Sequence, residues 1–151
     1  MSKKSGFKSP KAIIGWREWC ALPDLKLPGV LAKIDTGAKT SAIHAFDIRP
    51  SERGGDWLTF WLHPVQRRRK PVFHCEALCV DKRAVTSSNG KTEERPVIET
   101  TLSLGGRSFV TEITLTNRDE MGFRMLIGRL SLNRRFVVDP VLSFCCGQLD
   151  E

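Results

Sequence analysis

An Asp-Thr-Gly triplet at residues 35–37 constrains the fold of this chain more than any other feature of its sequence. Apolar Val30, Ala32 and Ile34 alternate with other residues before it, which predicts a strand that ends at Asp35. At such a strand end the Thr hydroxyl can bond a neighbouring backbone group, and Gly, which has no Cβ, allows a second segment to approach closely. The same three residues also form ordinary turns, so the triplet alone leaves a purely structural role open.

A second motif lies near the C-terminus, where the apolar run 125–127 leads into Gly128-Arg129. A short helix is expected directly after it, over residues 130–135. Upstream of this motif, the apolar stretches 97–104 and 108–116 flank a Gly-Gly turn and predict a β-hairpin. The chain therefore carries two motifs in a fixed order, separated by predicted strands.

The order of these motifs resembles that of the retropepsins, the retroviral-type aspartic peptidases, in which an apolar-Asp-Thr-Gly-Ala segment precedes an apolar-Ile-Gly-Arg segment. The resemblance covers most of residues 12–139. More narrowly, the chain is similar to a bacterial family of retropepsin-like proteins, the RimB-like family, whose members are called ATP-dependent zinc proteases. The segments that carry this narrower resemblance are Gly15–Trp19, Leu22–Leu25, Ala32–Ser41, Val85–Gly90, Asn117–Asp119 and Val138–Pro140.

The resemblance implies an all-β fold, a closed six-stranded retropepsin-like (acid protease) barrel with one short C-terminal helix. We expect a flexible basic tail at residues 1–11 and one such domain at residues 12–151, because 151 residues are enough for one hydrophobic core. A two-lobed aspartic peptidase needs about twice this length to supply both aspartates, so a single triplet implies that two chains share one site. The expected active species is a homodimer.

In the mechanism that the resemblance implies, Asp35 is the catalytic residue. The Asp35 carboxylates of two chains hold one water between them and share one proton, because two carboxylates about 3 Å apart cannot both ionise cheaply. Thr36, Gly37 and Ala38 form the scaffold of the site. A hydroxyl at position 38 would lower the apparent pKa of the pair, so Ala38 suits work near neutral pH. The mechanism requires no cofactor and no metal.

A turn between the predicted strands is the candidate flap that closes over substrate. It contains Ser88, Asn89 and Gly90, and Asn-Gly favours a tight hairpin turn. An ordinary exposed hairpin is the alternative interpretation. The other expected strands are 12–21, paired with 29–35, and 57–62, paired with 72–80 around a basic loop.

Charge indicates the class of substrate. The chain has 24 Lys and Arg against 17 Asp and Glu, a net charge of +7. In a strand Lys33 shares a face with Asp35, roughly 7 Å away. Lys39 stands where retroviral enzymes commonly carry an acid that pairs with the Arg of Ile-Gly-Arg, here Arg129. These three cations are the expected substrate-binding residues, and they favour an acidic, glutamate-rich peptide. The alternative is that Lys33 and Lys39 only extend into solvent or pair with nearby acids.

The resemblance adds a family association to this charge argument. Relatives are often encoded beside a RimK-type glutamate ligase, which adds glutamates to a ribosomal protein. A peptidase that trims glutamate tails would complete that cycle, so the ligase, the ribosome and an acidic peptide are the expected partners.

Zinc and ATP, which the family's name mentions, have little support in the residues. His63, His74, Cys75 and Cys79 carry zinc-compatible atoms, but neither Cys-x-x-Cys nor His-Glu-x-x-His occurs. His74 and Cys75 would point to opposite faces of a strand. No glycine-rich phosphate loop with Lys-Ser/Thr occurs in the sequence, so we expect no ATP binding by this chain.

The expected location is the cytoplasm. The first ten residues are polar, no run of 18 apolar residues indicates a membrane span, and we expect no membrane contact. The five cysteines, an odd number, do not indicate a disulfide framework and suit a reducing compartment.

One rival hypothesis comes from the densest basic run, Arg67–Lys70, which Trp57 and Trp61 precede. Adjacent cations can bind RNA phosphates, although such runs are usually solvated. On this hypothesis the chain is a non-catalytic basic adaptor that binds ribosomal RNA or a ribosome-modifying enzyme.

Overall fold

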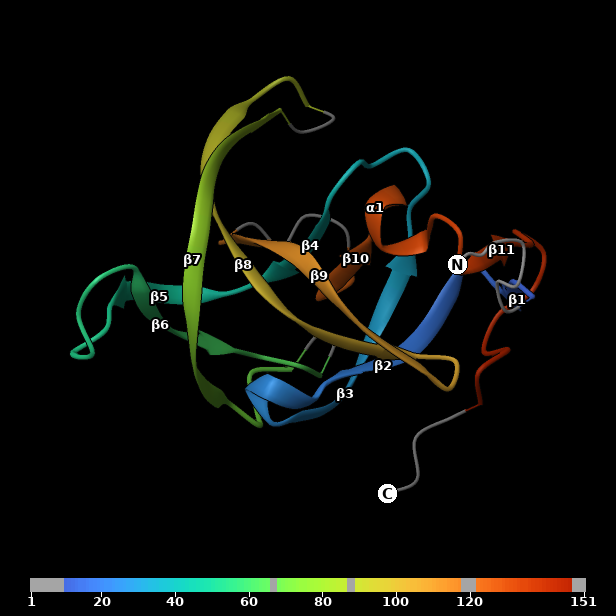
Figure 1. Ribbon diagram of the computed structural model, residues 1–151, viewed down its shortest axis with the longest axis horizontal. Helices are drawn as coiled ribbons and strands as arrows, with labels where there is room; N and C mark the ends of the chain where they lie inside the picture. Colours follow the sequence, from blue (N-terminus) through green and yellow to red (C-terminus); the bar gives the residue numbers. More distant parts are fainter. Residues whose placement is uncertain (1–9, 66–67, 87–88, 118–121, 148–151) are drawn as a thin grey trace, which may run out of the picture.

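The computed structural model in Figure 1 describes residues 10–65, 68–86, 89–117 and 122–147. No helix in these ranges has the length and apolar character needed to cross a bilayer. The elements, in chain order, are β1 (Ala12–Ile14), β2 (Arg17–Leu22), the 3-10 helix η1 (Pro23–Leu25), β3 (Leu27–Ile34), β4 (Ser41–His44), β5 (Phe46–Pro50), β6 (Trp57–Leu62), β7 (Phe73–Thr86), β8 (Thr92–Leu104), β9 (Arg107–Thr116), β10 (Met125–Ile127), α1 (Arg129–Leu132) and β11 (Phe136–Val138).

Six strands form a closed ring. They follow one another in the order β2-β3-β10-β4-β9-β8, and the ring closes where Ala21 of β2 pairs with Ser103 of β8. Inward-facing side chains of these strands alternate with outward-facing ones and build the core, as the alternation before the Asp-Thr-Gly triplet predicts. The predicted all-β fold with a closed six-stranded ring and one short helix is confirmed. Fully buried members of the core include Leu22, Val30, Ala32, Ile98, Leu102, Ile113 and Ile127.

A second group of strands extends the sheet beyond β8, in the order β7, β6, β5. The predicted hairpin of 57–62 with 72–80 forms as β6 and β7, and the hairpin of 97–104 with 108–116 forms as β8 and β9. Both β7 and β8 are longer than predicted. They pair out to Thr86 and Thr92, and Figure 1 shows this long hairpin extending beyond the ring on the side of α1.

The N-terminal strand differs from the prediction, because residues 12–21 form two strands rather than one. The strand breaks at Gly15, where an added Cβ would lie 2.1 Å from the carbonyl oxygen of Leu142. The chain must therefore turn to pass the C-terminal segment, and Trp16 N–H donates to Leu142 O at 2.9 Å. Only β2 pairs with β3, whereas β1 pairs in parallel with β11.

Glu18 anchors this C-terminal segment. Its side chain is buried, and its two carboxylate oxygens accept hydrogen bonds from Gly15 N–H at 2.7 Å, Cys145 N–H at 2.9 Å and Cys146 N–H at 3.0 Å. Burial raises the pKa of a carboxyl group, but the three backbone donors outweigh it, and the pKa of Glu18 lies below its ordinary value. One buried charge thus joins β2 to the C-terminal residues.

We predict that Glu18→Ala lowers the free energy of unfolding by about 2 to 4 kcal/mol, because one buried and two partly buried N–H groups lose their acceptor. Urea unfolding followed by tryptophan fluorescence measures the change. Glu52→Ala, which removes an exposed carboxylate, is the control. A loss no larger than that of the control would contradict the anchoring role of Glu18.

The same carboxylate predicts a pH dependence. Because its pKa is depressed in the folded state, Glu18 contributes fully to the free energy of unfolding above the ordinary carboxyl pKa of 4.5. This contribution is lost as the pH falls through the lower pKa of the folded state. The stability difference between wild type and Glu18→Gln should therefore shrink as the pH is lowered from about 6 to about 3. A difference that stays constant over this range would show that Glu18 is not ionised in the folded protein.

Candidate active site

Asp35 lies directly after β3, at the start of an exposed turn. Its N–H donates to Ile127 O at 2.9 Å, so the backbone at this point is fixed to β10. Gly37 N–H donates to the Asp35 carboxylate at 3.0 Å, and Ala38 N–H donates to Asp35 O at 3.2 Å. Asp35 is half-buried, while Thr36 and Gly37 are exposed. The turn therefore presents an oriented carboxylate at the surface of the chain.

The Ile-Gly-Arg motif packs directly against this turn. Arg129 N–H donates to Ala38 O at 2.8 Å and Leu130 N–H donates to Lys39 O at 3.0 Å, so the first turn of α1 binds the residues that follow Asp35. A Cβ on Gly128 would lie 2.8 Å from the carbonyl carbon and oxygen of Thr40. Only glycine fits at this approach, which gives a physical reason for the spacing of the two motifs.

Three buried hydroxyl groups link the two motifs by hydrogen bonds. Ser41 Oγ accepts from Gly128 N–H at 3.1 Å and lies 2.7 Å from Ser131 Oγ, which in turn lies 2.8 Å from Thr111 Oγ1. Our sequence reasoning missed this network, because it joins residues far apart in the chain. The sequence signal for the network was the presence of these polar side chains within otherwise apolar elements.

Of the predicted substrate-binding cations, Arg129 has a clear structural contact. Its Nη1 donates to Thr36 O at 3.0 Å, so the guanidinium supports the Asp35 turn in place of pairing with an acid at position 39. Lys39 is exposed and Lys33 is half-buried. Neither lysine forms an ion pair within the described ranges.

A row of side chains crosses the sheet on the face opposite the core. Its members occupy paired positions on neighbouring strands: Arg17 (β2), Lys33 (β3), Leu126 (β10), Ala42 (β4) and Thr114 (β9). Paired residues point to the same face, and residues two apart along a strand share that face. Asp35 follows Lys33 by two residues, so the row runs beside the candidate catalytic turn.

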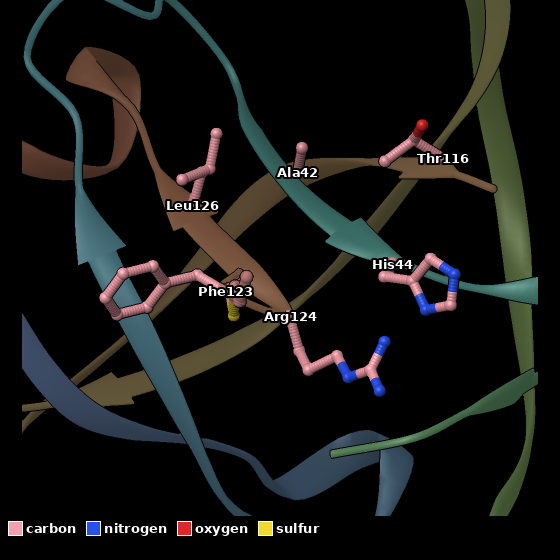
Figure 2. Close-up of a pocket in the computed structure, with 7 residues that line it drawn as sticks. Ala42, His44, Thr116, Phe123, Arg124 and Leu126 are labelled. Carbon is pink, nitrogen blue, oxygen red and sulfur yellow. The ribbon is translucent and has the colours of Figure 1, made fainter. Parts of the chain in front are cut away.

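A shallow pocket opens beside β4 and β10, and Figure 2 shows the side chains that line it. Its empty volume is about 200 Å³, part of which is open solvent. His44 and Arg124 form its polar end, and His44 N–H donates to Arg124 O at 2.8 Å. The residues that line it are Ala42, His44, Thr116, Phe123, Arg124, Met125 and Leu126.

The predicted flap residues lie at the end of the β7–β8 hairpin. Asn89 and Gly90 are exposed, Gly90 has a left-handed φ of 84°, and Asn89 Oδ1 accepts from Lys91 N–H at 3.1 Å. Ser88 lies outside the described residues. The flap role stays a prediction.

The four zinc-compatible residues contact separate partners. His63 stacks on Phe46 with a ring separation of 4.3 Å, and the ring of His74 lies 4.5 Å from that of Trp61 at a tilt of 44°. The Cys75 thiol points to Leu25 O at 3.8 Å, and the Cys79 thiol to Asp81 O at 3.2 Å. Across the described ranges, no three His, Cys, Asp or Glu side chains converge to hold a metal ion. The donor set does not fit a zinc site.

Comparison with known proteins agrees with this geometry. The family model of the "Retropepsin-like aspartic endopeptidase RimB" matches residues 13–148. A protein of unknown function from Legionella pneumophila has a solved structure that aligns with a TM-score of 0.72 and 29% identity, over 91% of this chain and 99% of that chain.

Curated relatives are longer. The chain is 49% identical over 93% of its length to a "Probable alpha-L-glutamate ligase" of Shewanella halifaxensis, and 50% identical over 91% of its length to a protein of the same name from Shewanella pealeana. It spans only 31% and 30% of those two proteins. The match to the family model over nearly the whole chain, together with the Asp35 turn and its glycine contact, shows that the chain belongs to the RimB-like family of retropepsin-like aspartic endopeptidases.

Proposed function

We propose that this chain is an aspartic-type peptidase that acts as a homodimer. The observation that carries the proposal is the Asp35 turn: an accessible carboxylate held by Gly37 N–H and backed by the close approach of Gly128. The chain contains one Asp-Thr-Gly triplet, so a second copy related by a two-fold axis supplies the other carboxylate.

In this dimer the two Asp35 carboxylates share one proton. The ionised carboxylate removes a proton from a bound water, which attacks the scissile carbonyl carbon, and the protonated carboxyl group donates its proton to the carbonyl oxygen. Gly37 N–H orients each Asp35 carboxylate by a hydrogen bond. Arg129 keeps the turn in place through Thr36 O, so the two carboxylates meet without reorganising the backbone.

The proposed substrate is an acidic, glutamate-rich peptide, such as the tail of a glutamylated ribosomal protein in the cytoplasm. Lys33 and Lys39 flank Asp35, and neither forms an ion pair within the described ranges, so both can attract carboxylates. The relatives named glutamate ligase support this substrate class, although that name belongs to proteins of which this chain spans about 30%. A ligase forms glutamyl peptide bonds, and a carboxylate pair with a water is suited to cleaving them, so a RimK-type ligase is the proposed functional partner.

A second candidate function is the non-catalytic basic adaptor. Arg68, Arg69 and Lys70 are exposed on the loop before β7, and the Arg53 guanidinium stacks over Trp57 at 3.6 Å on the same group of strands. Exposed cations next to aromatic rings are typical of surfaces that bind RNA. The adaptor does not need Asp35, which separates the two functions experimentally.

We predict that Asp35→Asn abolishes cleavage of a glutamate-rich peptide and leaves the unfolding transition nearly unchanged, because the amide cannot act as the base. Chelators and ATP should not change the rate of the wild type. Cleavage by Asp35→Asn, or loss of wild-type activity in a chelator with recovery in zinc, would contradict the mechanism. Full cellular function of Asp35→Asn would favour the adaptor.

We also predict that activity depends on the square of protein concentration below the dimer dissociation constant, because each chain supplies half of the site. Addition of excess Asp35→Asn chains should inhibit the wild type by forming mixed dimers. Activity that stays proportional to concentration, where sedimentation shows dissociated chains, would contradict a shared site.

A further inference from the structure

Arg17 and Lys33 form a pair of like charges on β2 and β3. They occupy directly paired positions in the antiparallel ladder, where side chains share a face and Cβ atoms lie about 5 Å apart. Like charges in such positions destabilise a sheet unless an anion lies between them. Neither residue has an ion-pair partner within the described ranges. The fold therefore holds two cations side by side, and the carboxylate that the sequence places nearest to them on this face is that of Asp35.

Arg17 is held rigidly, unlike most surface arginines. Its guanidinium carbon lies 4.8 Å from the ring centre of Trp16 and 4.6 Å from that of Phe144. Its Nε is buried and has no hydrogen-bond partner among the residues that the structure describes. A buried N–H donor without an acceptor is uncommon in folded proteins. The covered Nε cannot itself reach a ligand, but Arg17 as a whole is only half-buried, so part of its side chain is accessible.

The C-terminal segment positions this guanidinium. Phe144 has a left-handed φ of 57°, which is unusual for an aromatic residue, and its N–H donates to Arg17 O at 3.1 Å. The next two residues are bound by the Glu18 carboxylate. The strained backbone at Phe144 thus places its ring against Arg17, and such strain is commonly found at functional sites.

The pair lies beside the candidate active site. Lys33 precedes Asp35 by two residues, which places the two Cα atoms about 7 Å apart, the length of two residues of an extended peptide. The row that begins with Arg17 and Lys33 continues through Leu126 and Ala42 into the pocket of Figure 2. Trp16 also contacts Phe123 of that pocket, with ring centres 5.9 Å apart.

We propose that Arg17 and Lys33 form a carboxylate-binding subsite that receives an acidic group of the substrate one or two residues from the scissile bond. The planar guanidinium can bind both oxygens of a carboxylate, and Lys33 adds a second charge from the opposite strand. This inference rests on the proposed function, because it assigns a substrate contact to the same site. The carboxylate is a glutamate side chain or the C-terminus of a peptide, which have the same chemistry.

Binding to Asp35→Asn protein tests the subsite independently of cleavage. Titration calorimetry compares a tetraglutamate peptide with an amidated C-terminus, the same peptide with a free C-terminus, and amidated tetraglutamine. Arg17→Gln and Lys33→Gln should each weaken binding of the acidic peptides by about 5- to 30-fold and leave the tetraglutamine signal unchanged. An effect confined to the free-acid peptide would assign the subsite to the C-terminal carboxylate.

Lys26→Gln is the matched control. Lys26 is an exposed lysine directly before β3, at the opposite end of the strand from Lys33, so its removal changes the net charge equally. It should alter acidic-peptide binding by less than about 2-fold. If Lys26→Gln weakens binding as much as Lys33→Gln, general charge attraction explains the preference and the subsite is refuted.

Folding of the variants is checked by thermal unfolding, because Arg17→Gln also loses its contacts with two aromatic rings. If Arg17→Gln does not fold, Lys33→Gln decides the outcome, since Lys33 makes no comparable contact. An unchanged ratio of acidic to neutral peptide affinities in folded Lys33→Gln would overturn the subsite, even if Asp35 proves essential for cleavage. A reduced ratio, together with cleavage that survives Asp35→Asn, would support the subsite and refute the proposed mechanism.

Discussion

The backbone contact between the Asp35 turn and the Gly128 segment is the constraint on which the candidate site depends. Asp35 N–H binds Ile127 O, Arg129 N–H binds Ala38 O, and Gly128 lets the two segments approach within van der Waals distance. These contacts join two parts of the chain separated by about ninety residues, so they fix the carboxylate only when the six-stranded ring is closed. Folding and assembly of the site are therefore one event.

Much of the fold could be predicted because its signals are local. The alternation that ends at Asp35, the Gly-Gly turn between β8 and β9, and the order of the two motifs all appear within short stretches of sequence. The order of the two motifs carries the family resemblance, and both the family and the closed all-β ring that the resemblance implied are confirmed. The packing of the Asp35 turn against the Gly128 segment is seen only in the structure.

Other features could not be predicted because they depend on contacts between distant segments. A lone glutamate in β2 is usually solvent-exposed, and nothing local shows that Glu18 is buried under Cys145 and Cys146. The break at Gly15 exists because Leu142 crosses there, and the parallel pairing of β1 with β11 follows from the same crossing. The role of Arg17 likewise appears only when Phe144 is placed against it.

The charges of this chain connect the fold to its proposed function. A buried carboxylate, Glu18, holds the C-terminal segment, and that segment in turn holds the Arg17 guanidinium on the strand next to Lys33. Two neighbouring cations without an ion-pair partner among the described residues favour an acidic peptide over a neutral one. The relatives named glutamate ligase match this chain over 31% and 30% of their own length.

The most direct test of the central claim is the distance between the two Asp35 carboxylates in a crystal structure of the assembled protein. The account predicts a two-fold dimer in which these carboxylates lie about 3 Å apart with one water between them. A dimer whose Asp35 side chains point to separate regions of solvent, or a protein that remains monomeric while it cleaves its substrate, would contradict a site shared between two chains.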